Sequence, residues 1–303
     1  MTDLPLEYVR TLLAAVDEGT FDAAAEALHV TPSAVSQRIK ALEQRTGRVL
    51  LTRSKPVRPT ESGQVVVRFA RQLARLETDA RTELGLAGSE ETTLLPIAVN
   101  ADSLATWFLP ALTRVPDEPR ISFELHREDE SRTTELLRSG RVMAAVTSSP
   151  DPVQGCSVRT LGRMRYLPAA SPEFLARWLP DWPDVPLRRS ITSIPVVQFE
   201  RSDGMQDRFA RRLTHGRPAS SMRHFVPSSE GFTAAVVAGM GWGMVPGPQA
   251  ESHLAAGRLV LLEPERPLDV ALFWQQWKLD SPALSSVAAA VAQVAAEALH
   301  PVS

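Results

Sequence analysis

One face of a predicted helix near the N-terminus carries short polar side chains and a cation. In the stretch TPSAVSQRIKALEQRTG (residues 31–47), the spacing i, i+3, i+4 and i+7 brings together Ser33, Ser36, Gln37 and Lys40. A glutamine amide suits an adenine edge, a lysine suits a guanine edge or a phosphate, and serine hydroxyls suit either. The spacing therefore predicts a face that contacts DNA.

The charge of the surrounding segment favours the same partner. Residues 31–58 carry seven basic residues and one acidic residue, a net charge of +6, whereas residues 1–30 carry one basic and six acidic residues, a net charge of −5. A basic segment in a chain whose total net charge is −2 is typical of a protein that binds the phosphate backbone. A solvated basic face without a ligand is the alternative that charge alone leaves open.

The elements around this face predict a winged helix-turn-helix domain over residues 1–60. Periodic apolar residues favour a first helix, and Thr20 suits the cap of a second one. Thr31 then suits the N-cap of a third helix and Pro32 its first position, and the stretch VLLTRSKPVRPTESG follows as a strand–turn–strand wing. A three-helix packing module without DNA is the rival interpretation. The residues that we expect to contact DNA are Thr31, Pro32, Ser33, Ser36, Gln37, Arg38, Lys40 and Arg53.

The window GTFDAAAEALHVTPSAVSQRIKALEQRTGRVLLTR (residues 19–53), with the PTESG that follows, resembles the LysR-type transcriptional regulators. In that family this window is a winged helix-turn-helix, so the resemblance implies a regulator that reads double-stranded DNA at an operator with dyad symmetry, and not an enzyme. Thr20 stands where the family usually has Ser, a change that keeps the capping hydroxyl. The resemblance extends over the whole chain and is looser after this window.

Residues 61–91 predict a long linker helix and a polar hinge. An approximate coiled-coil seam repeats at intervals of three and four residues: Val66, Phe69, Leu73, Leu76, Ala80 and Leu84. A helix that packs on its own domain is the alternative. Pairing with a second chain would present two recognition helices to half-sites about one DNA turn, or a multiple of one, apart. The resemblance implies the same homodimer, often paired further into a homotetramer.

Strand and helix patterns alternate over residues 92–303. LLPIAVN, ISFELHRE and VMAAVTS predict strands with helices between them, and this order argues for a parallel sheet with crossover connections. A second set of strands follows, and DVALFWQQW with the terminal helix returns to the first set. This is the plan of an α/β, two-lobed, periplasmic-binding-protein-like domain. We expect lobe I at about residues 92–164 and 269–303, and lobe II at about residues 165–268.

Polar residues follow the strands of both lobes, at the edge where ligands of such sheets bind. Hydroxyls at the predicted start of a helix near Ser103 suit a carboxylate. Acids from both lobes suit an ammonium or guanidinium group, and Trp107 suits a cation–π contact. Together they describe an amino acid, and favour a cationic one, although capping a helix is an equal alternative for each single acid. The residues that we expect to contact this effector are Asp102, Ser103, Thr106, Trp107, Asp129, Glu130, Thr147, Asp203, Ser229 and Glu230.

Within the family, the C-terminal part is more similar to the ArgP/LysG subgroup. The strings that carry this resemblance are VNADSLATWF, EDESRTTELLRSG, SEGFTAAVVAGMGWGMVP and FWQQWKLDSP. The subgroup responds to lysine and arginine and controls genes for export or metabolism of basic amino acids. The resemblance implies as effector contacts Ser103, Thr106, Trp107, Asp129 and Asp203.

Other classes of function lack their signals. No apolar run is long enough to span a membrane and the acidic N-terminus lacks a signal pattern, so we expect a cytoplasmic protein. The single Cys156 and the scattered histidines offer no metal site, and neither a catalytic nor a cofactor motif is found. An amino-acid-binding protein without DNA function is the rival class, and an acidic or aromatic metabolite the rival effector. RNA polymerase is a further partner that the role of a regulator implies.

Overall fold

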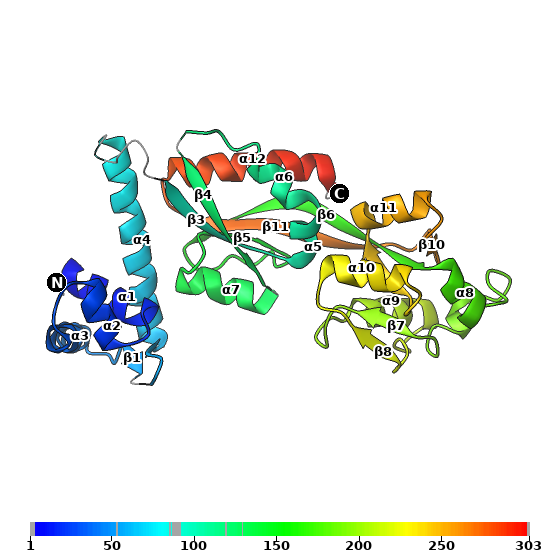
Figure 1. Cartoon of the computed structure of the whole chain (residues 1–303), viewed down its shortest axis with the longest axis horizontal. Coiled ribbons are helices and arrows are strands. Elements are labelled where there is room, and N and C mark those ends of the chain that lie inside the picture. The colour runs from blue at the N-terminus through cyan, green and yellow to red at the C-terminus, as the bar shows by residue number, and fades with distance from the viewer. Residues whose placement is uncertain are drawn as a thin grey trace.

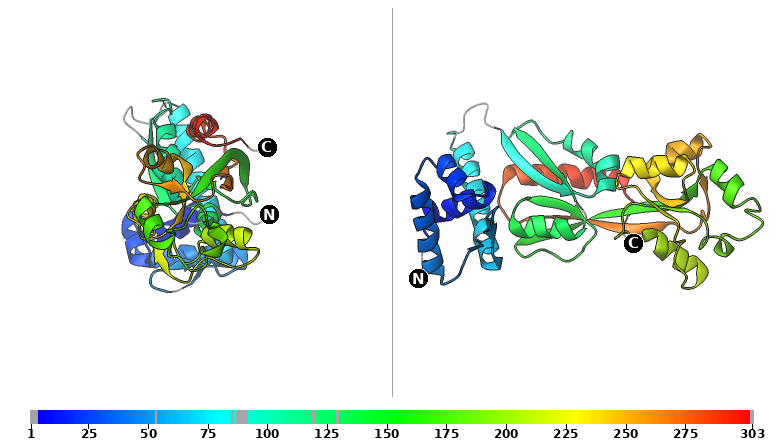
Figure 2. Two further views of the ribbon diagram at one scale, coloured as in Figure 1. Left: turned by 90° about the vertical axis from the view of Figure 1, so that its right-hand side faces the viewer. Right: turned by 60° about the horizontal axis from the view of Figure 1, so that its bottom comes forward.

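Figure 1 shows the computed structural model of the chain, which describes residues 4–52, 54–84, 86, 92–118, 120–128 and 130–301. A small helical unit and a long helix stand at one end, and an elongated domain with two lobes extends away from them (Figures 1 and 2). The predicted architecture, a winged helix-turn-helix with a linker helix and a two-lobed α/β domain, is confirmed.

The N-terminal unit contains α1 (Leu6–Asp17), α2 (Phe21–Ala27) and α3 (Pro32–Thr46). The hydroxyl of Thr20 accepts the N–H of Ala23, and that of Thr31 accepts the N–H of Ala34, so both predicted caps form. Gly47 ends α3 at a φ of 62°, a left-handed conformation that glycine adopts without strain. The apolar faces of the helices meet in a common core that includes Val9, Leu12, Val35, Ile39 and Leu42.

The wing is a short antiparallel pair, β1 (Leu51–Thr52) and β2 (Arg58–Pro59). The carboxylate of Glu43 holds its base to α3, because it accepts the N–H of Leu50 at 2.8 Å. The linker helix α4 (Glu61–Glu83) begins directly after β2, where the hydroxyl of Thr60 caps the N–H of Gly63. The wing and the linker helix are therefore one continuous extension of the DNA-binding unit.

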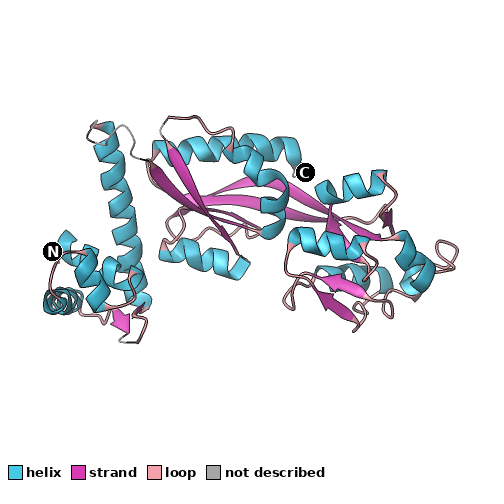
Figure 3. Ribbon diagram, viewed as in Figure 1, coloured by secondary structure: helices cyan, strands magenta, loops and turns pink. Residues whose placement is uncertain are grey.

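A single sheet runs through both lobes (Figure 3). In lobe I, β3 (Thr93–Val99) lies parallel to both β4 (Ile121–Arg127) and β5 (Ala144–Thr147). The long strands β6 (Cys156–Ala170) and β11 (Leu268–Trp277) pair antiparallel and continue into lobe II, where β9 (Gly243–Pro246) and β10 (Val260–Leu261) join β6. The predicted lobe boundary after residue 164 falls inside β6, because this strand belongs to both lobes.

Helices cover both faces of the lobe I sheet (Figure 1). On one face lies α12 (Pro282–Ala298), which packs on α6 (Leu109–Leu112), and on the other lies α7 (Glu130–Ser139). A continuous helical segment precedes α6: α5 (Ala101–Ser103) passes into a π-helical turn (Leu104–Phe108). This helix was predicted to begin at Ser103 and in fact begins at Ala101, which moves Ser103 into its first turn.

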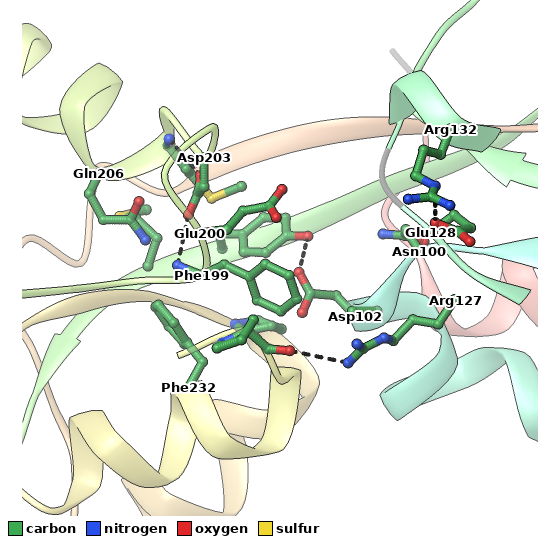
Figure 4. A pocket seen from close by; sticks show the side chains of 16 residues that line it. Asn100, Asp102, Arg127, Glu128, Arg132, Phe199, Glu200, Asp203, Gln206 and Phe232 are labelled. Atoms are coloured by element: carbon green, nitrogen blue, oxygen red, sulfur yellow. Dashed lines mark hydrogen bonds and ion pairs between the residues drawn. The ribbon is translucent and has the colours of Figure 1, made fainter. Parts of the chain in front are cut away.

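Lobe II adds a small parallel pair, β7 (Val196–Gln198) and β8 (Arg223–Phe225). Its helices are α8 (Pro172–Trp178), the 3-10 turn Leu187–Arg189, α9 (Met205–Thr214), α10 (Ser229–Val237) and α11 (Gly247–Ala255). A core that includes Ala169, Val197, Phe232, Val236 and Val245 joins α10 to the strands of this lobe. The starts of α9 and α10 and the start of α5 face the same space between the lobes (Figure 4).

Candidate functional site

The outer face of α3 presents the predicted polar residues to solvent. The residues that are exposed there are Thr31, Pro32, Ser33, Ser36, Gln37 and Lys40. Opposite them, Val35, Ile39 and Leu42 are buried in the N-terminal core. The wing contributes Lys55 and Arg58, both exposed, to the same end of the molecule. Hydroxyls, an amide and cations on a protruding helix with a basic wing can contact both the base edges and the backbone of DNA.

Arg38 is placed differently from the prediction. Its guanidinium forms an ion pair with the carboxylate of Glu7 and lies 3.4 Å from the hydroxyl of Thr11, so the side chain is directed toward α1. It is also half-buried, because α1 covers this flank of α3. Arg38 therefore connects two helices of the unit in this structure. The predicted contact Arg53 lies outside the described residues.

A cavity of about 400 Å³ lies between the lobes (Figure 4). Its walls are formed by Asn100, Ala101, Asp102, Arg127, Glu128, Arg132, Tyr166, Phe199, Glu200, Asp203, Met205, Gln206, Pro227, Phe232, Met244 and Pro246. The carboxyl ends of β3, β4 and β7 all contribute, as expected for a ligand site of an α/β sheet. The volume suits a small metabolite of amino-acid size.

Asp102 lies at the centre of this cavity and connects the lobes. Its carboxylate accepts the hydroxyl of Tyr166 at 2.7 Å and that of Ser229, at the start of α10, at 2.6 Å. The amide of Gln249 in α11 donates in turn to Ser229 at 2.9 Å. A second bond between the lobes runs from Arg127 to the carbonyl of Pro227 at 3.1 Å. The lobes are therefore held together by hydrogen bonds that begin on the cavity wall.

Burial raises the pKa of the Asp102 carboxyl above its usual value, because the ionised form is desolvated. The hydrogen bonds from Ser229 and Tyr166 act in the opposite direction, and the negative charges of Asp203 and Glu230 add to the rise. Burial and the neighbouring Asp102 likewise raise the pKa of the Tyr166 hydroxyl well above its usual value. A buried carboxyl with a raised pKa is a group that a bound cation would stabilise in its ionised form.

Asp203 both secures local structure and lines the cavity, although the N-cap of α9 is Gly204. Its carboxylate accepts the N–H of Met205 at 2.9 Å and the N–H of Phe199 at 3.3 Å, so it secures the start of α9 and the end of β7. It also lines the cavity. Asp102, by contrast, caps nothing: the N-cap of α5 is Asn100, and the partners of Asp102 come from β6 and α10.

Other predicted contacts do not line the cavity. Trp107 packs edge-to-face on Phe108 in the core of lobe I and is 3% exposed, so it forms no cavity wall. Ser103 is fully buried, and the hydroxyl of Thr106 donates to the carbonyl of Asp102 at 2.6 Å, because the helix begins earlier than predicted. Thr147 is buried at the end of β5, where its hydroxyl accepts the N–H of Ser149.

The remaining predictions fall on lobe II or on undescribed residues. Ser229 touches Asp102 behind the wall, and Glu230 is exposed and accepts the hydroxyl of Ser228 at 3.3 Å. Asp129 lies outside the described residues, as does the side chain of Glu130. The wall residues that sequence reasoning missed include Arg127, Tyr166, Phe199, Glu200, Gln206 and Phe232. Tyr166 lies in the middle of a long strand, where no local pattern distinguishes it from its neighbours.

None of the helices in the described ranges is long and apolar enough to cross a membrane.

Comparisons with known proteins agree on one family. Residues 6–64 match the bacterial regulatory helix-turn-helix protein family of LysR type, and residues 88–296 match the LysR substrate binding domain. The chain is 47% identical over 276 residues to the transcriptional regulator LysG of Mycobacterium tuberculosis. This match covers 91% of this chain and 88% of that protein.

Two solved structures are similar over almost the whole chain. ArgP from M. tuberculosis has a TM-score of 0.90 and 44% identity, and covers 97% of this chain and 98% of that one. Full-length LysG from Corynebacterium glutamicum with bound effector Arg has a TM-score of 0.82 and 39% identity, and covers 98% of this chain and 99% of that one. The chain therefore belongs to the LysR family of DNA-binding transcriptional regulators.

Proposed function

We propose that this regulator responds to a basic amino acid, lysine or arginine, that binds between the lobes of its C-terminal domain. The observation that carries the proposal is the charge of the cavity wall. Among the residues that the structure describes, four carboxylates line the cavity, Asp102, Glu128, Glu200 and Asp203, against two cations, Arg127 and Arg132. A wall with this excess of acids favours a ligand whose net charge is positive, and the two arginines can still hold its carboxylate.

Relatives support the same effector. LysG of C. glutamicum has a solved structure with Arg bound as effector, and its curated description is a lysine export transcriptional regulatory protein. That relative is 41% identical over 96% of this chain. We infer that this protein controls genes for the export or metabolism of basic amino acids, and that it acts in the cytoplasm, where the operator DNA is.

Two chains pair through the linker helix in this proposal. Phe69 and Leu76 lie along α4 and Leu84 follows its last residue, and the three side chains remain exposed, with exposed fractions of 39%, 44% and 72%. Apolar side chains repeated along a helix that joins two domains favour a coiled-coil partner, and an identical chain supplies the same seam. The homodimer, paired further into a tetramer, would present its α3 helices to the half-sites of a dyad operator and would contact RNA polymerase there.

The proposed DNA contacts are the exposed residues of α3, from Thr31 to Lys40, with the wing residues Arg53, Lys55 and Arg58. The proposed effector contacts begin with Asp102 and Asp203. An effector that binds better to one arrangement of the lobes shifts the chain toward that arrangement, and it changes operator affinity only by that difference in affinity. Because α4 connects the DNA-binding unit to lobe I, a change in lobe I would alter how the two α3 helices are placed.

The test is fluorescence anisotropy of the full-length protein with a duplex from upstream of its own gene, at one fixed salt concentration. Lysine, arginine, glutamate and buffer alone are compared on this duplex and on a scrambled one. We expect preference for the natural duplex and a change in affinity with lysine or arginine only. If the protein prefers the natural duplex and none of the amino acids changes its affinity, the proposed effector is excluded. The assignment of the chain as a DNA-binding regulator would remain.

A further inference from the structure

Two buried oxygen atoms on the cavity wall lack a hydrogen-bond partner. Among the residues that the structure describes, these are Oδ1 of Asn100 and Oε1 of Gln206. Both residues line the cavity, Asn100 from lobe I and Gln206 from lobe II (Figure 4). Buried acceptors are nearly always paired, since an unpaired one loses its hydrogen bonds to water without replacement. Unpaired acceptors that face a cavity are expected where a ligand supplies the donors.

Neither oxygen is needed by its own helix. Asn100 occupies the N-cap of α5, where an asparagine oxygen usually accepts a helix N–H, but it makes no such bond. Gln206 lies in the first turn of α9 and is 1% exposed, while the carboxylate of Asp203 accepts the N–H at the start of that helix. The fold therefore leaves both oxygens available on opposite walls of one site.

The charges beside the two oxygens differ. Near Asn100, lobe I presents Arg127 and the ion pair of Glu128 with Arg132, whose atoms lie 3.1 Å apart. Near Gln206, lobe II presents the carboxylates of Glu200 and Asp203, and no basic residue of lobe II is found on the described part of the cavity wall. The lobe I end can thus accept a group with both charges, whereas the lobe II end accepts only a cation.

We propose that Gln206 is the residue that recognises the side-chain cation of the effector. The α-amino and α-carboxylate groups then lie at lobe I, where Asn100 accepts from the ammonium group and Arg127 binds the carboxylate. The side chain crosses the cavity, and its terminal ammonium or guanidinium group donates to Oε1 of Gln206 beside Asp203. This inference rests on the proposed function and adds the direction in which the effector binds and the residue that selects a basic side chain.

The experiment is calorimetric titration of the full-length protein with lysine and with norleucine, which has the same four-carbon side chain without the ammonium group. We expect the wild type to bind lysine at least tenfold more tightly than norleucine. Gln206→Leu, which keeps the volume and removes the acceptor, should reduce this ratio about tenfold by weakening lysine and not norleucine. Met222→Leu, an apolar change at an exposed position of lobe II that does not line the cavity, should leave the ratio unchanged.

A second variant covers the case in which Gln206→Leu does not fold. Gln206→Glu keeps an acceptor and adds a negative charge, so the lysine-to-norleucine ratio should rise above that of the wild type. If the wild type prefers lysine and both variants keep the same lysine-to-norleucine ratio as the wild type, the role of Gln206 is overturned. The proposed effector is then unaffected. A wild type that binds neither lysine nor arginine would instead reject the proposed function itself.

Discussion

At the scale of single residues, Asp102 connects the chemistry of the cavity to the arrangement of the lobes. Its two carboxylate oxygens accept from Tyr166 and Ser229, so the same group faces the effector site and holds lobe II. A cation that binds beside Asp102 would change the strength of the two hydrogen bonds that this carboxylate accepts. We therefore expect the protonation state of Asp102 to affect both effector affinity and the contact between the lobes.

The raised pKa of Asp102 predicts a pH dependence of stability. For a carboxyl whose pKa is higher in the folded state, the stabilisation from its proton is complete below the unfolded-state pKa and is lost as the pH rises through the folded-state pKa. Without effector, we expect the melting temperature to fall across this window in the wild type and to fall less in Asp102→Asn. Thermal unfolding of both proteins over a pH series measures the difference.

Asp102→Asn should also weaken lysine binding about tenfold or more, because the bound cation loses its buried counter-charge. At pH values above this window, saturating lysine should then restore the melting temperature of the wild type and not that of Asp102→Asn. Parallel pH curves for the two proteins would show that Asp102 ionises with an ordinary pKa and does not control stability.

At the scale of elements, we expect α3 to read the base sequence of DNA and the wing to bind its phosphate backbone. Gln37 is exposed on α3 where it can reach a base edge, while Lys55 is exposed on the wing. Loss of a base contact removes discrimination, whereas loss of a phosphate contact weakens binding to every sequence. The two residues therefore form a matched pair of probes.

Gln37→Ala should reduce the preference for operator over random duplex about tenfold. Lys55→Ala should weaken binding to both duplexes equally and reduce the dependence of log affinity on log salt concentration by about one unit. Anisotropy titrations with both duplexes at several salt concentrations measure both effects. Equal losses on both duplexes for the two variants would contradict the assignment of Gln37 to a base.

The linker helix is attached to lobe I by a row of arginines. Arg68 donates to the carbonyl of Gln154, Arg71 donates to that of Ser139, and Arg75 donates to the hydroxyl of Ser281 at 3.2 Å. Arg75 is also paired with Asp79 at 2.6 Å, and both side chains are almost buried. These contacts set the position of α4 against the effector domain.

Ser281→Ala should lower the free energy of unfolding by about 1 kcal/mol, because the fully buried hydroxyl loses its bond to Arg75 while the pair with Asp79 remains. Ser285→Ala removes an exposed hydroxyl from the same helix and should be nearly neutral. Urea unfolding of the two variants compares them. Identical stabilities would mean that the contact between α4 and α12 contributes nothing measurable.

At the scale of the whole molecule, we expect the exposed apolar residues of α4 to determine whether two chains pair. Leu76→Glu places a charge in the proposed seam and should raise the dissociation constant of the dimer at least tenfold. Operator affinity should fall with it, because one recognition helix then binds alone. Sedimentation velocity and anisotropy measure these two effects.

Thr82→Glu is the matched control, since Thr82 is exposed on the same helix away from the seam. It should leave both the dimer and the operator affinity unchanged. A Leu76→Glu variant that remains as dimeric as the control would show that the chains pair elsewhere.

The elements were predicted well because their signals are local. Thr20 and Thr31 each follow the pattern of a capping hydroxyl, and each one accepts the N–H of the residue three positions further along. Gly47 likewise ends α3 through its own left-handed conformation. A cap involves atoms only a few residues apart, so the chain needs no tertiary contact to specify it. The start of α5 was misplaced because Asn100 occupies the N-cap without capping.

The cavity was predicted less completely because its residues are far apart in the chain. Asp102 and Asp203 were expected there and do line it, but Trp107 turned into the core of lobe I. A sequence shows that a residue follows a strand and not which way its side chain points. Gln206 and Tyr166 reach the wall only because the fold brings α9 and β6 to the same cavity as the start of α5, and no local pattern marks them.

The sequence by itself therefore determined the DNA-binding unit, the linker helix and the alternation of strands and helices that builds two lobes. These follow from capping, periodicity and charge within short segments. Only the tertiary structure decided which residues meet across the lobes: Asp102 with Ser229, Arg127 with Pro227, and Asn100 opposite Gln206. Such pairs are separated by about a hundred residues, so only the packing of the whole sheet brings them together.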